Sequence, residues 1–243
     1  MGKKKIIVAD IHGQISIFRH VYSYIIDELG KDNDIEVGFI GDYGDRGESG
    51  KLNKKSYKDI GSREVYLLLI ELREYFLKNK IKHFFLRGNH ERELLGYIDN
   101  KKNVTMSYIF PLENAYEGMC AKPSIIKKVK EFLQDSKLYH LDEEQKQLFV
   151  HAGIDPHMEN ILESDPSYFL WAREHFFNSK RVFPYRVVFG HTKMAMPMVK
   201  PDRIGIDGGA YENGWLNVLL FDDNLAKIIS FDKNGTIITR CEE

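Results

Sequence analysis

The sequence contains little cysteine and no long apolar run. Its two cysteines, Cys120 and Cys241, lie far apart in the chain and outside every cluster of polar residues considered below. We therefore expect reduced thiols in a cytoplasmic protein rather than a disulfide framework. No stretch approaches the roughly 18 apolar residues of a membrane span. The apolar run at residues 6–9 is also too short for a secretory signal, and we expect no membrane partner.

The chain also lacks an excess of charge of either sign. Its formal net charge is −1 over 243 residues, so no global field favours binding to nucleic acid. The sequence shows no internal repeat and no low-complexity linker. A chain of this length can bury a substantial core, and we expect residues 1–243 to form a single domain.

What the sequence does contain is a set of apolar runs that end in polar residues of the kind that bind metals. The run at residues 35–40 breaks at Gly41 into a turn that presents Asp42, Asp45 and Arg46. The two carboxylates would repel each other without a cation nearby. Four further runs end in the same way, at Asp10 and His12, at Arg87, Asn89 and His90, at His151, and at His191. Five buried strands with such ends should converge on one site.

The segments between these runs have the spacing of helices and strands. A first helix is expected over residues 14–29 and should end at Gly30, and a second should begin after a cap at Ser62. Two further helices are expected to begin at Ser124 and after residues 165–166. From residue 185 onward we expect only strands, the last two joined by a turn at 232–235. Apart from the helix at Ser124, the pattern of residues 92–144 does not indicate clear helices or strands. The order of the elements predicts an α/β layered fold.

The side chains at these strand ends suit a metal centre. Carboxylate, imidazole and amide oxygen bind borderline-to-hard divalent cations, and the absence of cysteine ligands argues against a structural zinc site. Asp42 has two oxygens and can bridge two cations. We expect two divalent cations, manganese first, with iron or zinc as alternatives. Two such ions about 3.5–4 Å apart clamp a phosphoryl group and generate hydroxide from bridging water, which would attack in line.

The residues beside these ligands suit hydrolysis of a phosphoester. Arg46 and Arg87 each flank a ligand motif, and guanidinium groups match phosphate oxygens. His90 can protonate a leaving-group oxygen, and Asp45 can orient it. Taken alone, each motif has an ordinary explanation, such as a turn or a satisfied buried histidine. The ordered set of five motifs is what predicts the hydrolase.

This set resembles the phosphoprotein phosphatase branch of the calcineurin-like metallophosphoesterases, and in particular its bacterial and phage-type serine/threonine phosphatases. The resemblance spans residues 5 to about 221, through motifs at 10–13, 41–47, 87–91, 151–153 and 190–192. It implies an α/β/β/α fold, which is a two-sheet β-sandwich flanked by helices, with a binuclear site at the strand ends.

The resemblance also implies a role for each residue. The first metal would be held by Asp10, His12 and Asp42, and the second by Asp42, Asn89, His151 and His191. The catalytic residues would be the acid pair His90 and Asp45, with Arg46 and Arg87 binding phosphate. Residues 170–173 look like those of the bacterial and phage members, in which the arginine at the place of Arg173 also reaches the phosphate.

Two features bear on the branch of the family. Residues 151–153 look like the bacterial, phage and dinucleoside-tetraphosphatase members, whereas Arg87 and Glu91 favour the protein-phosphatase side. We therefore expect hydrolysis of phosphomonoesters, first of all phosphoserine and phosphothreonine in proteins. The alternative is a symmetrical bis(5'-nucleosyl)-tetraphosphatase. A more remote alternative is a phosphate-binding scaffold without catalysis.

Residues 48–61 look like an insertion near the mouth of the active site, because relatives begin the next helix sooner after the Asp-Arg-Gly motif. The insertion carries four lysines, Lys51, Lys54, Lys55 and Lys58. They could attract an anionic substrate, but we favour a plain solvated loop. On that interpretation, residues 51–59 can be deleted without loss of the fold or of bound metal.

Overall fold

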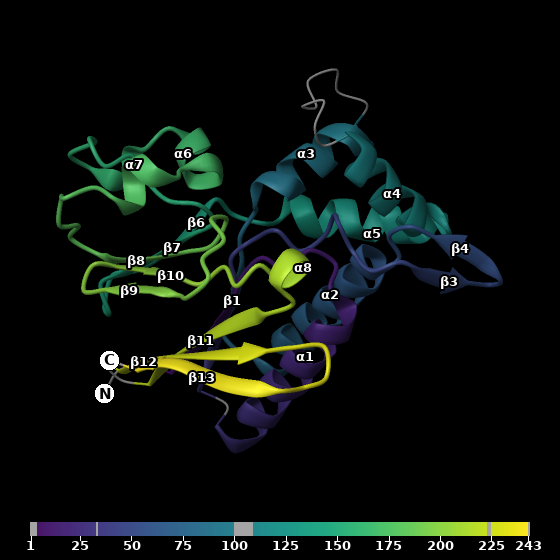
Figure 1. The fold of residues 1–243 in the computed structure, drawn as a ribbon, viewed down its shortest axis with the longest axis horizontal. Helices are drawn as coiled ribbons and strands as arrows, with labels where there is room; N and C mark the ends of the chain where they lie inside the picture. Colours follow the sequence, from purple (N-terminus) through teal and green to yellow (C-terminus); the bar gives the residue numbers. More distant parts are fainter. Residues whose placement is uncertain (1–3, 33, 100–108, 223–224, 243) are drawn as a thin grey trace.

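The computed structural model describes residues 4–32, 34–99, 109–222 and 225–242, and two stacked β-sheets lie at its centre (Figure 1). The first sheet has the strand order β13-β12-β11-β1-β2-β5. Its strands are β1 (Lys5–Val8), β2 (Glu36–Phe39), β5 (His83–Phe85), β11 (Leu216–Asp222), β12 (Leu225–Phe231) and β13 (Ile237–Glu242). Strands β1, β2 and β5 are parallel, and Val8 lies opposite Phe39. The first two strands therefore end level, and both lead into predicted site residues.

The second sheet has the order β6-β7-β8-β10-β9. Its strands are β6 (Tyr139–Asp142), β7 (Gln147–Val150), β8 (Arg186–Phe189), β9 (Met198–Lys200) and β10 (Arg203–Gly205). Strands β7, β8 and β10 are parallel to one another. All residues of β1, β2 and β7 are buried, as expected of parallel strands that are covered on both faces. The five predicted strands that lead into the site are thus all present.

Helices cover the outer face of each sheet. They are α1 (Ile15–Lys31), α2 (Gly61–Asn79), α3 (Asn89–Ile98), α4 (Ile109–Cys120), α5 (Pro123–Gln134), α6 (Pro166–Trp171), α7 (Glu174–Phe177) and α8 (Ala210–Asn213), with a 3₁₀ turn at Ile161–Glu163. Helices α3 and α4 and strand β6 occupy parts of the chain for which the sequence predicted no element, and α5 is the helix expected from Ser124, with its start at Pro123. In the part of the chain that the structure describes, no helix is long and apolar enough to cross a membrane.

Three apolar clusters hold these layers together. Between the two sheets, Ile7 and Phe84 of the first meet Phe149 and Val188 of the second. A second cluster packs α1, α2 and α5 against the first sheet, and a third packs α6 and α7 against the second. The resulting order is helix, sheet, sheet, helix, which confirms the predicted fold class.

Two predicted helix ends are wrong by a short distance. Helix α1 continues past Gly30 to Lys31, because a side chain at position 30 would meet nothing and the turn there needs no left-handed residue. Helix α2 begins at Gly61, so Ser62 lies inside its first turn rather than at the cap. The Ser62 amide instead donates to Asp59 Oδ1 at 2.9 Å.

The region that follows residues 165–166 differs more from the prediction. Asp165 caps α6 as predicted, since it accepts a hydrogen bond from the Ser167 amide at 2.8 Å. The helix ends at Trp171, however, because Ala172 is extended and Arg173 leads into the separate helix α7. Helix α8 interrupts a region that was expected to contain only strands.

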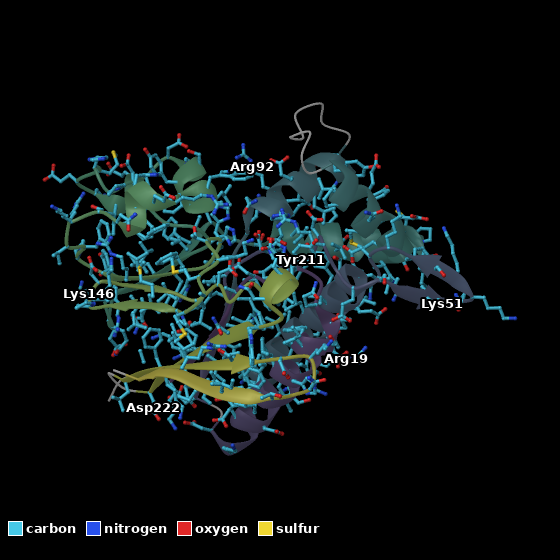
Figure 2. All side chains as sticks on the ribbon, in the orientation of Figure 1. Arg19, Lys51, Arg92, Lys146, Tyr211 and Asp222 are labelled. Carbon is cyan, nitrogen blue, oxygen red and sulfur yellow. The ribbon has the colours of Figure 1, made fainter. Side chains whose placement is uncertain are left out.

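The insertion forms a two-stranded hairpin, β3 (Gly50–Leu52) and β4 (Lys55–Tyr57). Asn53 and Lys54 both have positive φ, which is typical of a two-residue hairpin turn. The hairpin extends outward beside α4 (Figure 1), and Lys51 points away from the molecule (Figure 2). Lys55 forms an ion pair with Glu117 of α4 at 2.9 Å.

Candidate metal centre and active site

The loops that follow the parallel strands of both sheets meet at one place. The loop after β1 is joined to the loop after β2 by hydrogen bonds from the amide of Asp10 to Gly41 O at 3.1 Å and from the amide of His12 to Asp42 O at 2.9 Å. The carboxyl end of β8 joins the same place, where the His191 amide donates to Asp10 Oδ1 at 3.0 Å. The predicted convergence of five strand ends is therefore present.

The backbone at this place is unusual. Ten described residues other than glycine have positive φ, and six of them are predicted site residues, namely Asp10, His12, Asp42, Asp45, Arg46 and His191. Such conformations cost about 1–3 kcal/mol each for ordinary side chains and gather at functional sites. The strain here is the consequence of turning each side chain sharply from its strand toward the common centre.

Asp42 lies at the centre of two groups of candidate ligands. Its Oδ2 is 3.6 Å from His12 Nε2 on one side and 3.4 Å from His151 Nε2 on the other. His151 Nε2 is in turn 3.0 Å from Asn89 Oδ1 and 3.3 Å from His191 Nδ1. One carboxylate that faces two sets of ligands is the arrangement predicted for two cations.

Asp10, which is expected to bind the first metal, lies near Asp42, while the group of candidate ligands on the His12 side of Asp42 consists of His12, Asp42 and His90. A side chain at Gly190 would come within 1.9 Å of Asp10 Oδ2, so glycine is needed there for the carboxylate to fit. Burial, and then the neighbouring carboxylates of Asp207 and Asp42, raise the pKa of Asp10 well above its usual range. A cation beside these buried carboxylates would remove this repulsion.

The histidines are suited to bind metal as neutral imidazoles. Burial lowers the pKa of His12 to about 3 and lowers that of His191 to about 2. Among the described residues, the buried His12 Nδ1 and His191 Nε2 have no hydrogen-bond partner. Carboxylate, imidazole and amide donors without thiolate fit borderline-to-hard divalent cations. The residues present therefore fit the predicted metal ions.

His90 and Asp45 form a pair beside this centre. His90 Nδ1 and Asp45 Oδ2 are 2.6 Å apart, and His90 Nε2 is 3.8 Å from Asp42 Oδ2. Burial lowers the pKa of His90, but the charge of Asp42 and the hydrogen bond and charge of Asp45 outweigh it, so the pKa is raised. The bond to Asp45 fixes the proton on Nδ1 and turns Nε2 toward the centre.

This geometry agrees with the comparison of the chain with known families. Residues 4–230 match the family model described as calcineurin-like phosphoesterase. The chain belongs to this family. It is therefore a metallophosphoesterase, and its buried Asp and His clusters are the candidate metal-binding residues of the family.

Several relatives extend the comparison. The chain is 25% identical to the asymmetrical bis(5'-nucleosyl)-tetraphosphatase PrpE of Bacillus cereus, over 89% of this chain and 90% of that protein. It is 24% identical to the Bacillus thuringiensis protein of the same name, with the same coverage. The cold-active protein-tyrosine phosphatase of a psychrophilic Shewanella superposes with a TM-score of 0.61 at 18% identity, covering 98% of this chain and 80% of that chain. This structural likeness supports the metallophosphoesterase fold.

Sequence reasoning missed the part that Glu91 has in this metallophosphoesterase. Glu91 lies in the first turn of α3 and is fully buried. Its Oε2 accepts hydrogen bonds from the amides of Asp42 at 2.7 Å and Gly88 at 2.9 Å, and its Oε1 accepts from the Tyr43 amide at 2.8 Å. Glu91 therefore positions Asp42. Burial, and then the charge of Asp42, raise its pKa.

Asp207 was also passed over, although it directly follows the last parallel strand of the second sheet. It is buried, accepts a hydrogen bond from the Gly209 amide at 2.8 Å, and lies close enough to Asp10 to raise the pKa of that carboxyl. Burial raises the pKa of Asp207 itself to about 6. A polar residue at the end of a buried strand was the signal that could have found it.

The three predicted arginines have different surroundings. The Arg46 guanidinium lies 5.8 Å from the centre of the Tyr211 ring, and its charge acts on both His12 and His90. Arg173 is exposed and close enough to His191 to affect its pKa. Both guanidinium groups therefore lie near the candidate metal centre.

Arg87 is placed elsewhere. Its Nη2 donates to the carbonyl oxygens of Leu133 at 2.8 Å and Ser136 at 3.3 Å, and its Nε donates to Ser136 Oγ at 3.3 Å. The guanidinium thus caps the carboxyl end of α5. This placement argues against the predicted role of Arg87 in binding phosphate.

Proposed function

We propose that the chain is a binuclear metal-dependent phosphoesterase whose substrates are dinucleoside polyphosphates. The observation that supports the hydrolytic chemistry is the position of Asp42, which two groups of candidate ligands share. Beside Asp42 lies the pair of His90 and Asp45, in which Nδ1 and Oδ2 are 2.6 Å apart. Asp10 and His12 would hold one cation, and Asn89, His151 and His191 the other. Bound divalent ions would polarise phosphoryl oxygens and lower the pKa of bound water.

The residues of the chain have distinct tasks in this reaction. Arg46 and Arg173 near the metal centre would bind the phosphoryl oxygens and orient the group for in-line attack. His90, protonated on both nitrogens, would donate the Nε2 proton to the leaving oxygen. Asp45 holds the other nitrogen, so the imidazolium keeps its orientation while the proton is transferred. Glu91 keeps Asp42 in place.

The choice of substrate rests on two observations. The Bacillus relatives are named as bis(5'-nucleosyl)-tetraphosphatases and match along nine-tenths of their length. The sequence argument for phosphoproteins relied on Arg87 and Glu91. In this chain Arg87 caps α5 and Glu91 binds the amides beside Asp42, so neither residue carries information about the substrate.

The second candidate is the phosphomonoesterase expected from the sequence, with phosphoserine or phosphothreonine in proteins as substrate. The exposed position of Arg173 supports it, because an open rim admits a phosphate on a protein loop. Both candidates need the same metal centre and the same acid, so only a comparison of substrates separates them.

The test sets diadenosine tetraphosphate against a phosphoserine peptide at one manganese concentration. We expect kcat/KM to be higher for the dinucleotide. A higher value for the peptide would promote the second candidate. Identification of the products gives the cleavage position, since two ADP indicate symmetrical cleavage and ATP with AMP indicates asymmetrical cleavage. If neither substrate nor a chromogenic phosphomonoester is hydrolysed, the chain is a phosphate-binding scaffold.

A further inference from the structure

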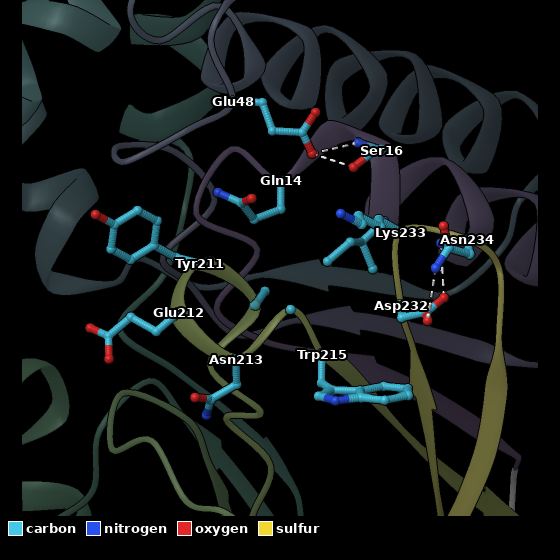
Figure 3. A pocket seen from close by; sticks show the side chains of 13 residues that line it. Gln14, Ser16, Glu48, Tyr211, Glu212, Asn213, Trp215, Asp232, Lys233 and Asn234 are labelled. Atoms are coloured by element: carbon cyan, nitrogen blue, oxygen red, sulfur yellow. Dashed lines mark hydrogen bonds between the residues drawn. The ribbon is translucent and has the colours of Figure 1, made fainter.

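A groove lies beside Gln14, which comes two residues after His12 in the sequence (Figure 3). Its volume is about 560 Å³, and its walls come from the start of α1, the base of the hairpin insertion, α8 and the turn between β12 and β13. A groove of this size can hold a ligand of the size of a nucleoside, because small-molecule sites usually span about 300–1,000 Å³. None of the motifs considered above explains it.

Gln14 joins the groove to the active site. Its side-chain amide donates to the carbonyl oxygens of His12 and Arg46, both at 3.0 Å. Tyr211, on the opposite wall, lies beneath the Arg46 guanidinium and is 49% exposed. Because an aromatic ring has two faces, a cation on one face leaves the other for a ligand. A group that stacks on the free face of Tyr211 would then be separated from Arg46 by the thickness of the ring.

The charges of the groove disfavour a second phosphate as the main occupant. Three carboxylates line it, Glu48, Glu212 and Asp232, against the ammonium of Lys233, and Glu212 is paired with Lys193 at 2.5 Å. Glu48 accepts the Ser16 amide at 3.0 Å, and Asp232 accepts the amides of its own turn, which helps keep its pKa low. Carboxylate and amide oxygens suit sugar hydroxyls and base amino groups, whereas they repel phosphate.

We propose that this groove binds one nucleoside of the substrate, with the base stacked on Tyr211 and the ribose among the polar side chains around Gln14. Trp215 forms the floor, where Arg240 lies 4.9 Å from its ring centre. Figure 3 shows Tyr211 and Lys233 on opposite sides of the pocket, with Gln14 between them and Trp215 below. The inference rests on the proposed function, since it assigns a place to one half of a dinucleoside polyphosphate.

The kinetic test compares Tyr211→Ala with Tyr211→Phe. Base stacking on an aromatic side chain is worth about 1–3 kcal/mol, which corresponds to about 5–150-fold in affinity. We expect Tyr211→Ala to lower kcat/KM for diadenosine tetraphosphate at least about 5-fold more than for p-nitrophenyl phosphate, mainly through KM, and Tyr211→Phe to restore it. The control is Tyr75→Ala, the same change at an exposed tyrosine on α2.

A binding test works without turnover. The sequence has two tryptophans, Trp171 and Trp215, so a Trp171→Phe background leaves Trp215 as the reporter. Adenosine should change its fluorescence and should compete with the dinucleotide, whereas ribose 5-phosphate, which lacks a base, should do neither. Tyr211→Ala in this background should weaken the adenosine response at least about 5-fold.

The outcomes separate the subsite from the proposed function. Adenosine binding that depends on Tyr211, in a protein that prefers a phosphopeptide, would keep the subsite and overturn the choice of substrate. Equal adenosine binding by Tyr211→Ala and the unchanged protein would overturn the subsite, even if the dinucleotide is the better substrate. Equal losses on the dinucleotide and on p-nitrophenyl phosphate would also overturn it, because Tyr211 would then act only through Arg46. A loss confined to phosphopeptides would assign the groove to a peptide instead.

Discussion

At the scale of single residues, the clearest distinction is between residues that would bind the metal ions and the residue that would protonate the leaving group. Asp10 and His151 lie among the candidate ligands, so Asp10→Asn and His151→Ala should lose bound metal. His90 lies with His12 and Asp42 in one of the two groups of candidate ligands, but its Nδ1 is bonded to Asp45. In the proposed assignment Asp10 rather than His90 is the ligand, so His90→Asn should keep the metal and lose about 10²–10⁴-fold in turnover. Metal content and kcat measured on the same samples check this, and the loss should shrink for leaving groups of low pKa. Full activity of His90→Asn on an alkyl phosphate would remove the acid assignment.

The same scale shows what a sequence pattern can and cannot assign. Asp10, Asp42 and His151 were found because each follows an apolar strand. Parallel pairing of β1 and β2 brings Asp10 and Asp42 together, and the stacking of the two sheets brings His151 to them. Arg87 has the same kind of position, but its side chain is long enough to turn back onto α5. Its role depends on where α5 packs, which the local sequence does not state.

At the scale of elements, the sequence predicted strands better than helix boundaries. The strands could be recognised because burial on both faces requires continuous apolar runs. The start of α2 was misplaced because residues outside the helix support it, and the start of α1 has similar support, although the sequence predicted it correctly. The Ser16 amide in the first turn of α1 donates to Glu48 at 3.0 Å, 32 positions away. Asp59 Oδ2 accepts from Ser62 Oγ, which in turn accepts from the Asp45 amide at 2.8 Å.

The hairpin insertion gives a prediction at this scale. Deletion of residues 51–59 would remove Asp59, which is 2% exposed and also binds the Gly47 amide at 2.9 Å. The sharper variant replaces residues 51–56 by Asn-Gly and keeps the pair Gly50 and Tyr57. We expect it to retain fold, metal content and activity within about 2-fold, because an exposed loop costs little to shorten.

The matched control for that variant is Asp59→Ala, which leaves the hairpin and removes the support of Ser62 and, through it, of Asp45. It should lower kcat while the shortened hairpin does not. If the lysines of the hairpin instead steer the substrate, shortening it should raise KM for diadenosine tetraphosphate more than for p-nitrophenyl phosphate. Added salt should then produce the same change in the unaltered protein.

At the scale of the whole molecule, the active site depends on how the two sheets are held together, since each sheet supplies part of the ligands. Most of this contact is apolar, but at least two polar pairs of the described residues cross it. One joins His140 Nε2 of β6 to Glu36 Oε1 of β2 at 3.2 Å, and the other is an ion pair of a lysine. Lys5 of β1 is fully buried, and its Nζ lies 2.8 Å from Asp142 Oδ2 of β6. No sequence pattern indicates this pair, because a lysine at the start of an apolar run is usually solvent-exposed.

The pair leads to a prediction about stability. Asp142→Asn leaves a buried ammonium without its partner and should cost up to about 3–5 kcal/mol of the free energy of unfolding. Lys5→Met removes the buried charge and fills the same space, and the remaining carboxylate still accepts the Gln145 amide at 2.9 Å, so this variant should lose less. Urea unfolding at pH 7 measures both. A larger loss for Lys5→Met than for Asp142→Asn would contradict the assignment.

The pH dependence of this stability has a definite sign. Burial alone would raise the pKa of Asp142, but the Lys5 ammonium and the Gln145 amide outweigh it, so the pKa is lowered from its usual 3.8. A carboxyl with a depressed pKa in the folded state stabilises the fold above its unfolded pKa and loses that contribution as the pH falls through the folded value. The difference in unfolding free energy between the unchanged protein and Asp142→Asn should therefore be constant from pH 7 to about pH 5 and decrease below about pH 4. If the difference already decreases between pH 7 and pH 5, the pH dependence arises from the titration of a group other than Asp142.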